Sequence, residues 1–160
     1  MSLAFYDVDN TYANYLRSIE PKIPNIRYAN NDKFLCGIVL EVNGFKYYAP
    51  ISSFKINQLT NILIYHNQKA ISSIRFSYMF PCPDDVLAVK DFSLIADSKY
   101  RNLLIDEYNY CVGKEKEIVA KANYIYKRYL SGHDTLLLKN CCNFPLLEAA
   151  CMKYSTRNTL

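Results

Sequence analysis

The chain has 160 residues, which is the length of about one domain with a buried core. Apolar residues make up 51% and charged residues 21%, with a modest net charge of +4, so the composition excludes an intrinsically disordered chain. No stretch of about 18 apolar residues predicts a membrane span, and the first residues lack the basic and apolar regions of a secretion signal.

The N-terminal segment predicts a strand, a helix and a loop. Residues 3–7 are an apolar stretch of strand length, and Asp9, Asn10 or Thr11 can cap a helix that follows. Spacings of three and four residues give that helix one apolar face, made of Tyr12, Tyr15, Leu16 and Ile19. Pro21 and Pro24 end the helix, and residues 25–32 are polar and rich in turn formers. The sequence leaves open which end of the next strands this loop approaches.

Two strands joined by a tight turn come next. An apolar run, 34–42, leads into Asn43-Gly44, which is the strongest short-range signal for a β-hairpin. The returning strand should stop close to Pro50, because proline cannot donate to a sheet ladder. Just beyond it lie Ser52, Ser53 and Lys55. Loops that follow strands often carry reactive groups, although Ser-Ser-x-Lys is also compatible with an ordinary polar turn.

Short strands continue to about residue 90. Residues 61–66 and 70–76 predict a second hairpin around Asn67-Gln68-Lys69, residues 78–85 a loop with two prolines, and residues 86–89 a last strand. Five to six short, mostly antiparallel strands with such turns favour a small barrel or a strongly curled sheet.

The second half of the chain is predicted to be helical. Apolar spacing indicates helices over residues 98–113 and 114–130, the latter ending near Gly132, and a short closing helix over residues 144–152. With no repeat and no linker, we expect one α+β domain over residues 1–160 in which helices pack on the sheet. Residues 1–92 form its sheet-rich part with the N-terminal helix, and residues 93–160 its mostly helical part.

The positive charge is concentrated on the first hairpin and its continuation. No acidic residue lies between Glu41 and Asp84, whereas this window holds Lys46, Lys55, Lys69 and Arg75. A basic surface attracts phosphate backbones, and the 15 tyrosines supply rings that can stack on bases. We therefore consider Lys46, Tyr47, Lys69 and Arg75 candidate RNA-binding residues. A solvated basic surface without a partner is the alternative.

Several kinds of catalytic and metal site are absent from the sequence. The six cysteines include no Cys-x-x-Cys pair, and there is no P-loop, no dinucleotide fingerprint and no His-Glu-x-x-His motif. The basic window contains no carboxylates for a two-metal nuclease, and a histidine pair would require His66 and His133 to meet. We expect a reduced cytoplasmic protein that needs no metal and no other cofactor.

The first hairpin also carries a family resemblance. Residues 37–44, residues 47–53 and Lys55 resemble the signature of the type III toxin–antitoxin endoribonucleases, the ToxN/AbiQ-like family. The chain departs from the family pattern at Ile51 and Phe54. Residues 5–8 with Tyr12, Tyr15 and Leu16, and residues 74–81, agree with it further. The resemblance covers most of residues 3–90 closely and the helical remainder more loosely. It implies a compact, strongly bent sheet like that of other toxin ribonucleases, with helices packed around it.

The resemblance implies a sequence-specific endoribonuclease that works without a metal ion. Ser53 and Lys55 match the family's site residues with Ser52 beside them, and Tyr28 and Lys33 match further site positions in a loop of variable length. In such an enzyme the RNA 2′-hydroxyl attacks the adjacent phosphate, leaving a 2′,3′-cyclic phosphate and a 5′-hydroxyl. The protein has only to orient the reacting groups, move a proton and stabilise the developing charge.

The resemblance also implies the partners. Cellular mRNA is the expected substrate, and the antitoxin is a short, folded RNA repeat that the protein processes, keeps and is inhibited by. A closed assembly of alternating protein and RNA, with few protein–protein contacts, follows from this arrangement. The competing interpretation is a non-catalytic RNA-binding module that uses the same basic hairpin. Substitution of Lys55 would then weaken binding without abolishing a reaction.

Overall fold

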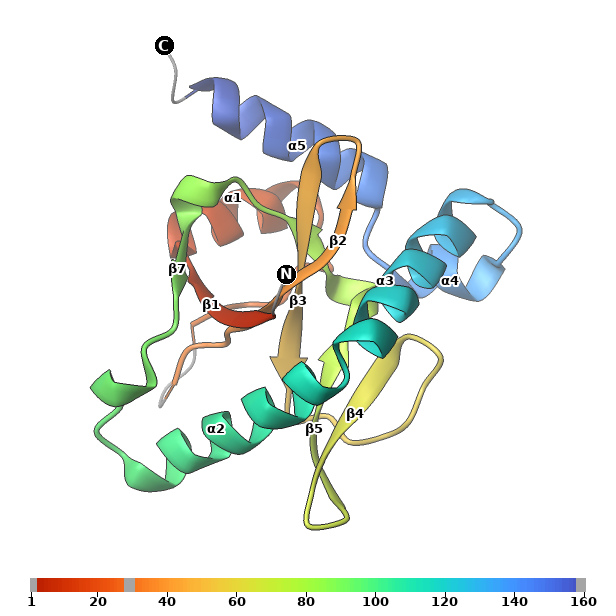
Figure 1. Ribbon diagram of the computed structural model, residues 1–160. Coiled ribbons are helices and arrows are strands. Elements are labelled where there is room, and N and C mark those ends of the chain that lie inside the picture. Colours follow the sequence, from red (N-terminus) through yellow and green to blue (C-terminus); the bar gives the residue numbers. More distant parts are fainter. Residues whose placement is uncertain (1–2, 28–30, 158–160) are drawn as a thin grey trace.

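The structure is a computed structural model that describes residues 3–27 and 31–157. Its centre is an antiparallel sheet in the order β4-β5-β3-β2-β1-β7, with β6 paired to β3 outside this path. The described strands leave β4 and β7 as edges, so of the two forms that the sequence predicted, the sheet takes the open one and not the barrel. Helices surround the sheet, which confirms the predicted α+β class (Figure 1).

The elements follow one another along the chain with these bounds. The strands are β1 (Ala4–Val8), β2 (Leu35–Val42), β3 (Phe45–Ser52), β4 (Asn61–His66), β5 (Lys69–Arg75), β6 (Phe80–Pro81) and β7 (Leu87–Val89). The α-helices are α1 (Asn10–Ile19), α2 (Ser98–Gly113), α3 (Glu115–Leu130), α4 (Thr135–Asn140) and α5 (Phe144–Arg157). Two of these elements, β6 and α4, were not predicted from the sequence.

Two hairpins shape the sheet as the sequence predicted. The turn between β2 and β3 has φ angles of 54° at Asn43 and 80° at Gly44, and positive values at both central residues define the type I′ turn. The turn between β4 and β5 also has positive φ at Asn67 and Gln68. Because type I′ turns match the natural twist of paired strands, the first hairpin is fixed by its local sequence.

Strand β3 is buried on both of its faces. The Tyr47 ring packs edge-on against Tyr126 of α3 and Phe144 of α5, with centroid distances of 5.6 and 5.9 Å. The Tyr48 ring lies over Gly37 of β2, where a Cβ atom would be only 2.2 Å from the ring. Neighbouring tyrosines are therefore both buried, and β3 lies inside the molecule instead of at its surface.

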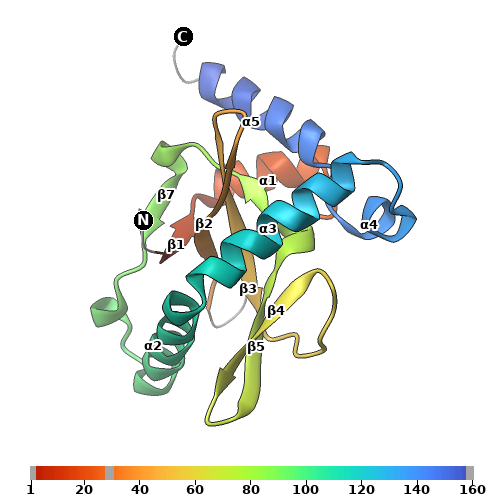
Figure 2. The same ribbon diagram turned by 45° about the vertical axis from the view of Figure 1, so that its right-hand side comes forward.

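The helices cover different parts of the sheet (Figure 2). Helix α2 packs against β4 and α3 against β2, whereas α1 packs against α5 and α5 against β6. Asp9 caps α1 by accepting a hydrogen bond from the Thr11 amide, and the buried Tyr12 hydroxyl donates to the carbonyl oxygen of Pro81 at 2.6 Å. Pro81 thus belongs to packed structure, although residues 78–85 were predicted to form a loop.

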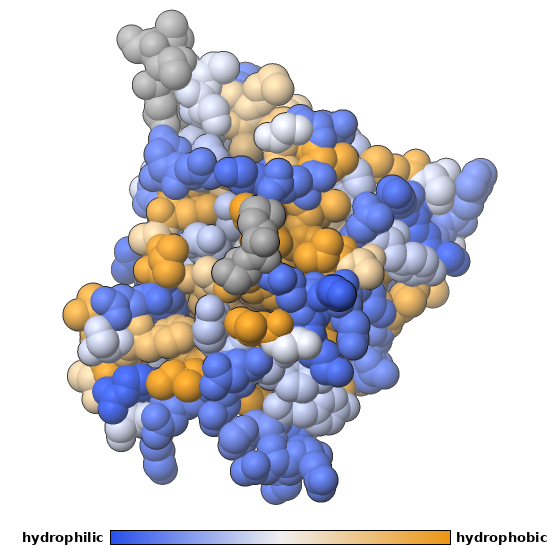
Figure 3. Space-filling model, in the orientation of Figure 1, coloured by the Kyte–Doolittle hydropathy of each residue, from blue (hydrophilic) through white to orange (hydrophobic). Residues whose placement is uncertain are grey.

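The surface mixes polar and apolar side chains. On the face shown in Figure 3, apolar patches lie between polar ones. None of the helices within the described ranges has the length and apolarity that a membrane crossing requires. The six cysteines are buried free thiols.

Candidate functional site

The far end of β3 meets β5 and the segment that precedes β2. Ile51 and Ser52 pair with Ile74 and Ser73 of β5. The Ile51 amide also donates to the Phe34 carbonyl oxygen at 3.2 Å. The segment before β2 therefore approaches this end of β3, which decides the question that the sequence left open. We call Ser52, Ser53, Phe54 and Lys55 the serine end of β3.

Two serine hydroxyls hold the turn at the serine end. Ser52 Oγ accepts a hydrogen bond from the Phe54 amide at 3.2 Å, and Ser73 Oγ donates to the Phe54 carbonyl oxygen at 2.6 Å. Such local bonds fix the backbone where the ladder stops. Ser53 and Lys55 stand on this fixed turn with exposed side chains, so both can reach a bound molecule.

Arg75, the last residue of β5, lies over the serine end. Its guanidinium carbon is 4.1 Å from the centroid of the Phe54 ring and 5.0 Å from that of Tyr78. Burial lowers the pKa of Arg75, while Tyr78 opposes the shift through its charge and a hydrogen bond. The buried Nε atom of Arg75 has no hydrogen-bond partner among the described residues. The two rings therefore hold a planar cation that retains capacity to donate, as in many sites that bind phosphate.

Lys33 brings a second positive charge to the same place. Burial lowers the pKa of Lys33, and the positive charge of Arg75 lowers it further. Its backbone amide donates to the Ile26 carbonyl oxygen at 2.8 Å, and the buried Ile26 side chain anchors this part of the loop. Two like charges placed close together are unfavourable for folding, whereas a bound anion would stabilise both.

The structure thus brings together five of the residues predicted from the sequence. Ser52, Ser53 and Lys55 form the serine end, Arg75 stacks on it, and Lys33 lies within electrostatic range of Arg75. The sixth candidate for this place, Tyr28, lies outside the described residues.

Three other predicted RNA-binding residues lie elsewhere. Lys46 and Lys69 are each six residues along a strand from Ser52 and Arg75, or roughly 20 Å away. Lys46 Nζ is 3.4 Å from Asp84 Oδ1, and Lys69 is exposed beside the β4–β5 turn. Tyr47 is fully buried, and its hydroxyl donates to Glu148 at 2.5 Å. The prediction that Tyr47 contacts RNA is therefore wrong in this structure, because its ring has no free face.

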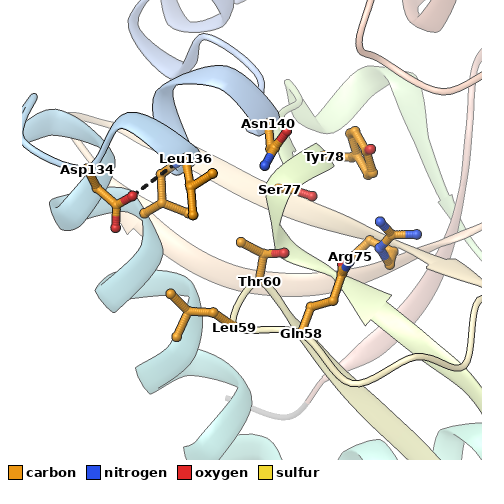
Figure 4. A pocket seen from close by; sticks show the side chains of 10 residues that line it. Gln58, Leu59, Thr60, Arg75, Ser77, Tyr78, Asp134, Leu136 and Asn140 are labelled. Carbon is orange, nitrogen blue, oxygen red and sulfur yellow. Dashed lines mark hydrogen bonds between the residues drawn. The ribbon is translucent and has the colours of Figure 1, made fainter.

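Sequence reasoning missed the aromatic part of the site. Tyr78 was assigned no role, and Phe54 was noted only as a departure from the family pattern. Their stacking on Arg75 depends on the pairing of β3 with β5, for which the sequence offers no local signal. A pocket of about 390 Å³ that opens beside Arg75 and Tyr78 was missed with them (Figure 4).

The arrangement can bind an anion and donate hydrogen bonds to it. Arg75 and Lys33 supply positive charge, and the exposed Ser53 and Lys55 supply a hydroxyl and an ammonium group. Within residues 3–27 and 31–157, no three His, Cys, Asp or Glu side chains are grouped to hold a metal ion. A phosphate group has the charge and the acceptor oxygens that these side chains would complement.

Comparison with known proteins assigns the chain to a family. Residues 4–152 match the family model described as the toxin ToxN of type III toxin–antitoxin systems. The endoribonuclease ToxN of Bacillus thuringiensis subsp. kurstaki is 26% identical over an alignment of 165 positions, which covers 96% of this chain and 85% of the relative.

Solved structures of two similar proteins have the same fold. One is a type III toxin that a non-coding RNA pseudoknot selectively inhibits, with a TM-score of 0.90 and 23% identity over 97% of this chain and 99% of the other. The second is AbiQ, a lactococcal anti-phage endoribonuclease of a type III system, with a TM-score of 0.88 and 25% identity. The match covers 98% of this chain and 99% of AbiQ.

Proposed function

The chain belongs to the ToxN toxin family of type III toxin–antitoxin systems and is an endoribonuclease, and we propose that it cleaves RNA at the serine end of β3. The observation that carries this location is the stacking of Arg75 on Phe54, the residue between Ser53 and Lys55, together with the closeness of Lys33 to Arg75. Two neighbouring positive charges repel each other, and the phosphate of a bound RNA strand stabilises both.

The proposed reaction uses a nucleophile that the RNA itself carries. The 2′-hydroxyl oxygen attacks the neighbouring phosphorus and loses its proton, the bond from phosphorus to the 5′ oxygen breaks, and that oxygen takes up a proton. The products are a 2′,3′-cyclic phosphate and a 5′-hydroxyl end. No cofactor is needed, because orientation, proton transfer and charge stabilisation are all within the reach of side chains.

Each residue of the site has a proposed role. Lys55 stabilises the negative charge that develops on the non-bridging oxygens, and Ser53 donates a hydrogen bond to one of them. Ser52 acts through the backbone, because its hydroxyl fixes the turn that carries both. Arg75 and Lys33 bind the phosphate backbone of the RNA. The lowered pKa of Lys33 makes its ammonium group a stronger acid than that of an ordinary lysine, and so a better proton donor.

The proposed natural partner is an RNA antitoxin. A groove that holds substrate RNA can also hold a folded RNA too rigid to align for cleavage, and the similarity to a toxin inhibited by an RNA pseudoknot supports this. We propose that the protein processes a repeat precursor, keeps the product in a closed protein–RNA assembly and acts on cytoplasmic mRNA. The similarity to an anti-phage endoribonuclease supports a role in phage defence.

The experiment that tests the reaction is cleavage of a long mRNA by the purified protein in EDTA, with the chemistry of the new ends determined. We expect cleavage at few sites and 5′-hydroxyl ends. An absolute need for magnesium, or 5′-phosphate ends, would contradict the metal-free mechanism. Tight RNA binding without any cleavage would favour a binding module instead.

A further inference from the structure

A pocket adjoins the proposed cleavage site and shares Arg75 and Tyr78 with it. Its other walls come from residues 58–60, ahead of β4, and from α4 (Figure 4). Its volume of about 390 Å³ lies near the lower end of the range for small-molecule pockets, roughly 300–1,000 Å³. The pocket therefore suits a single compact group next to the phosphate, and is too small for a folded RNA element.

The two ends of the pocket differ in charge. Arg75 lies at one end and Asp134 at the other (Figure 4). Asp134 Oδ2 is 2.6 Å from Arg128 Nε, and this hydrogen bond lowers the pKa of the Asp134 carboxyl, which also caps α4. Because Arg128 neutralises the Asp134 carboxylate, this end of the pocket carries little net charge, whereas the Arg75 end attracts a phosphate. A nucleotide would therefore enter with its uncharged base directed towards α4.

The pocket offers apolar faces and unused hydrogen-bonding groups. Leu59 and Leu136 lie on opposite sides of it, with 49% and 68% of their surface exposed. The side chains of Gln58, Thr60 and Asn140 make no hydrogen bond to another described residue, although each lines the pocket. Apolar side chains can cover the faces of a base, and amide groups can bond its edge at two points.

We propose that this pocket receives one nucleobase next to the scissile phosphate, and that Gln58 and Asn140 determine the base preferred there. The inference rests on the proposed function for the placement of the phosphate. It adds a specificity determinant, formed by α4 and the segment before β4, to a reaction centre formed by β3 and β5.

Binding of mononucleotides tests the pocket without requiring cleavage. The four ribonucleoside 3′-monophosphates are titrated separately, and shifts of the backbone amide resonances of residues 58–60 and 137–140 are followed by NMR. We expect one base to produce these shifts at the lowest concentration, and Asn140→Ala to weaken its binding about tenfold. The matched variant Asn102→Ala changes an exposed asparagine on α2 and should bind as the wild type does. Absence of shifts with all four, or equal binding of all four, would overturn the proposal.

Mapping of cleavage sites tests the same pocket in the reaction. The wild type, Asn140→Ala and Gln58→Ala cleave one long mRNA, and base frequencies are compared at each position around the cut. We expect both pocket variants to lose preference at the same single position by about tenfold, with unchanged end chemistry. Unchanged preferences at every position overturn the pocket and leave the cleavage reaction intact. If the wild type does not cleave, the proposed function fails, and the mononucleotide titration still decides whether the pocket binds a base.

Discussion

The polar side chains at the two ends of β3 differ in how far their interactions are satisfied within the protein. At the hairpin end, Glu148 of α5 accepts hydrogen bonds from the buried hydroxyls of Tyr47 and Tyr126, at 2.5 and 2.7 Å, and from the side-chain amide of Asn43 at 3.4 Å. At the serine end, Lys33 and Arg75 repel each other and the Nε atom of Arg75 has no partner among the described residues.

This contrast separates structural from functional polar groups. A buried group whose hydrogen bonds are satisfied within the protein stabilises one packed arrangement and has little left for a ligand. Like charges that lie close together weaken each other's protonated forms, and a bound anion would stabilise both. Substitutions at the hairpin end should therefore affect the free energy of unfolding, and substitutions at the serine end should affect RNA cleavage.

The largest expected effect is the loss of cleavage in Lys55→Ala. A charge that serves the transition state is worth about 3 kcal/mol or more, so the cleavage rate should fall at least a hundredfold. Lys46→Ala is the matched control, because this lysine lies near the hairpin end of β3, the strand that precedes Lys55, and pairs with Asp84 at the surface. The rates are measured in single-turnover reactions. Equal cleavage rates for the two variants would show that Lys55 does not take part in the reaction.

At the hairpin end, Glu148→Ala should destabilise the protein. It leaves the hydroxyls of Tyr47 and Tyr126 buried without their acceptor, and each unsatisfied group costs about 1–3 kcal/mol. We expect the free energy of unfolding, measured in urea, to fall by roughly 3 kcal/mol. The folded fraction should still cleave RNA at the wild-type rate. The exposed Glu41→Ala serves as control and should stay within about 0.5 kcal/mol.

Much of this contrast could be predicted from the sequence where local chemistry determines the structure. Asn43-Gly44 fixes the first hairpin, and the acid-free window includes Arg75, which stacks on Phe54 in the structure. Tyr47 was proposed to contact RNA because it lies in the basic window, whereas β3 is covered on both faces and its ring is buried.

The remaining features depend on contacts between distant segments. Lys33 and Arg75 are 42 residues apart in the sequence, and meet because β3 pairs with β5 while the segment before β2 bonds to Ile51. Helix α4 has only six residues, too few for a clear apolar period. Its one local signal is Asp134, which caps the helix by accepting from the Leu137 amide.

Glu107 lies between these two cases, because its carboxyl is buried and accepts a side-chain hydrogen bond from one described residue, Ser72. Burial raises its pKa to about 7, and a hydrogen bond from Ser72 opposes the shift only in part. Because the pKa in the folded state exceeds the ordinary value of 4.5, this group should cost stability as pH rises from about 4.5 to about 7, and no further above that.

Urea unfolding of the wild type and Glu107→Gln at pH 5 and pH 7.5 measures this cost. Relative to the wild type, the variant should gain roughly 2 kcal/mol between the two pH values, because its amide does not ionise. The control Glu117→Gln, on the exposed side of α3, should show no such gain. A constant difference between wild type and Glu107→Gln would show that Glu107 titrates normally.

A smaller effect is expected from Arg75→Lys. The charge remains, but an ammonium group cannot stack as a plane on Phe54 and Tyr78, so RNA binding should weaken by about tenfold. The dependence of binding on salt should stay the same, whereas Arg75→Met should lower its logarithmic slope by about one. Fluorescence anisotropy with a labelled RNA at several salt concentrations separates the contribution of the charge from that of the stacking. Wild-type affinity in Arg75→Lys would show that the stacked plane is not used.

The most direct test compares Ser53→Ala with Tyr47→Phe, each of which removes one hydroxyl from β3 or its end. For both variants the single-turnover cleavage rate and the free energy of unfolding are measured on the same preparation. Ser53→Ala should lose at least a hundredfold in rate with stability unchanged. Tyr47→Phe should lose about 1 kcal/mol of stability and keep its rate. Full cleavage by Ser53→Ala, or a catalytic loss confined to Tyr47→Phe, would contradict the assignment of the serine end as the reaction centre.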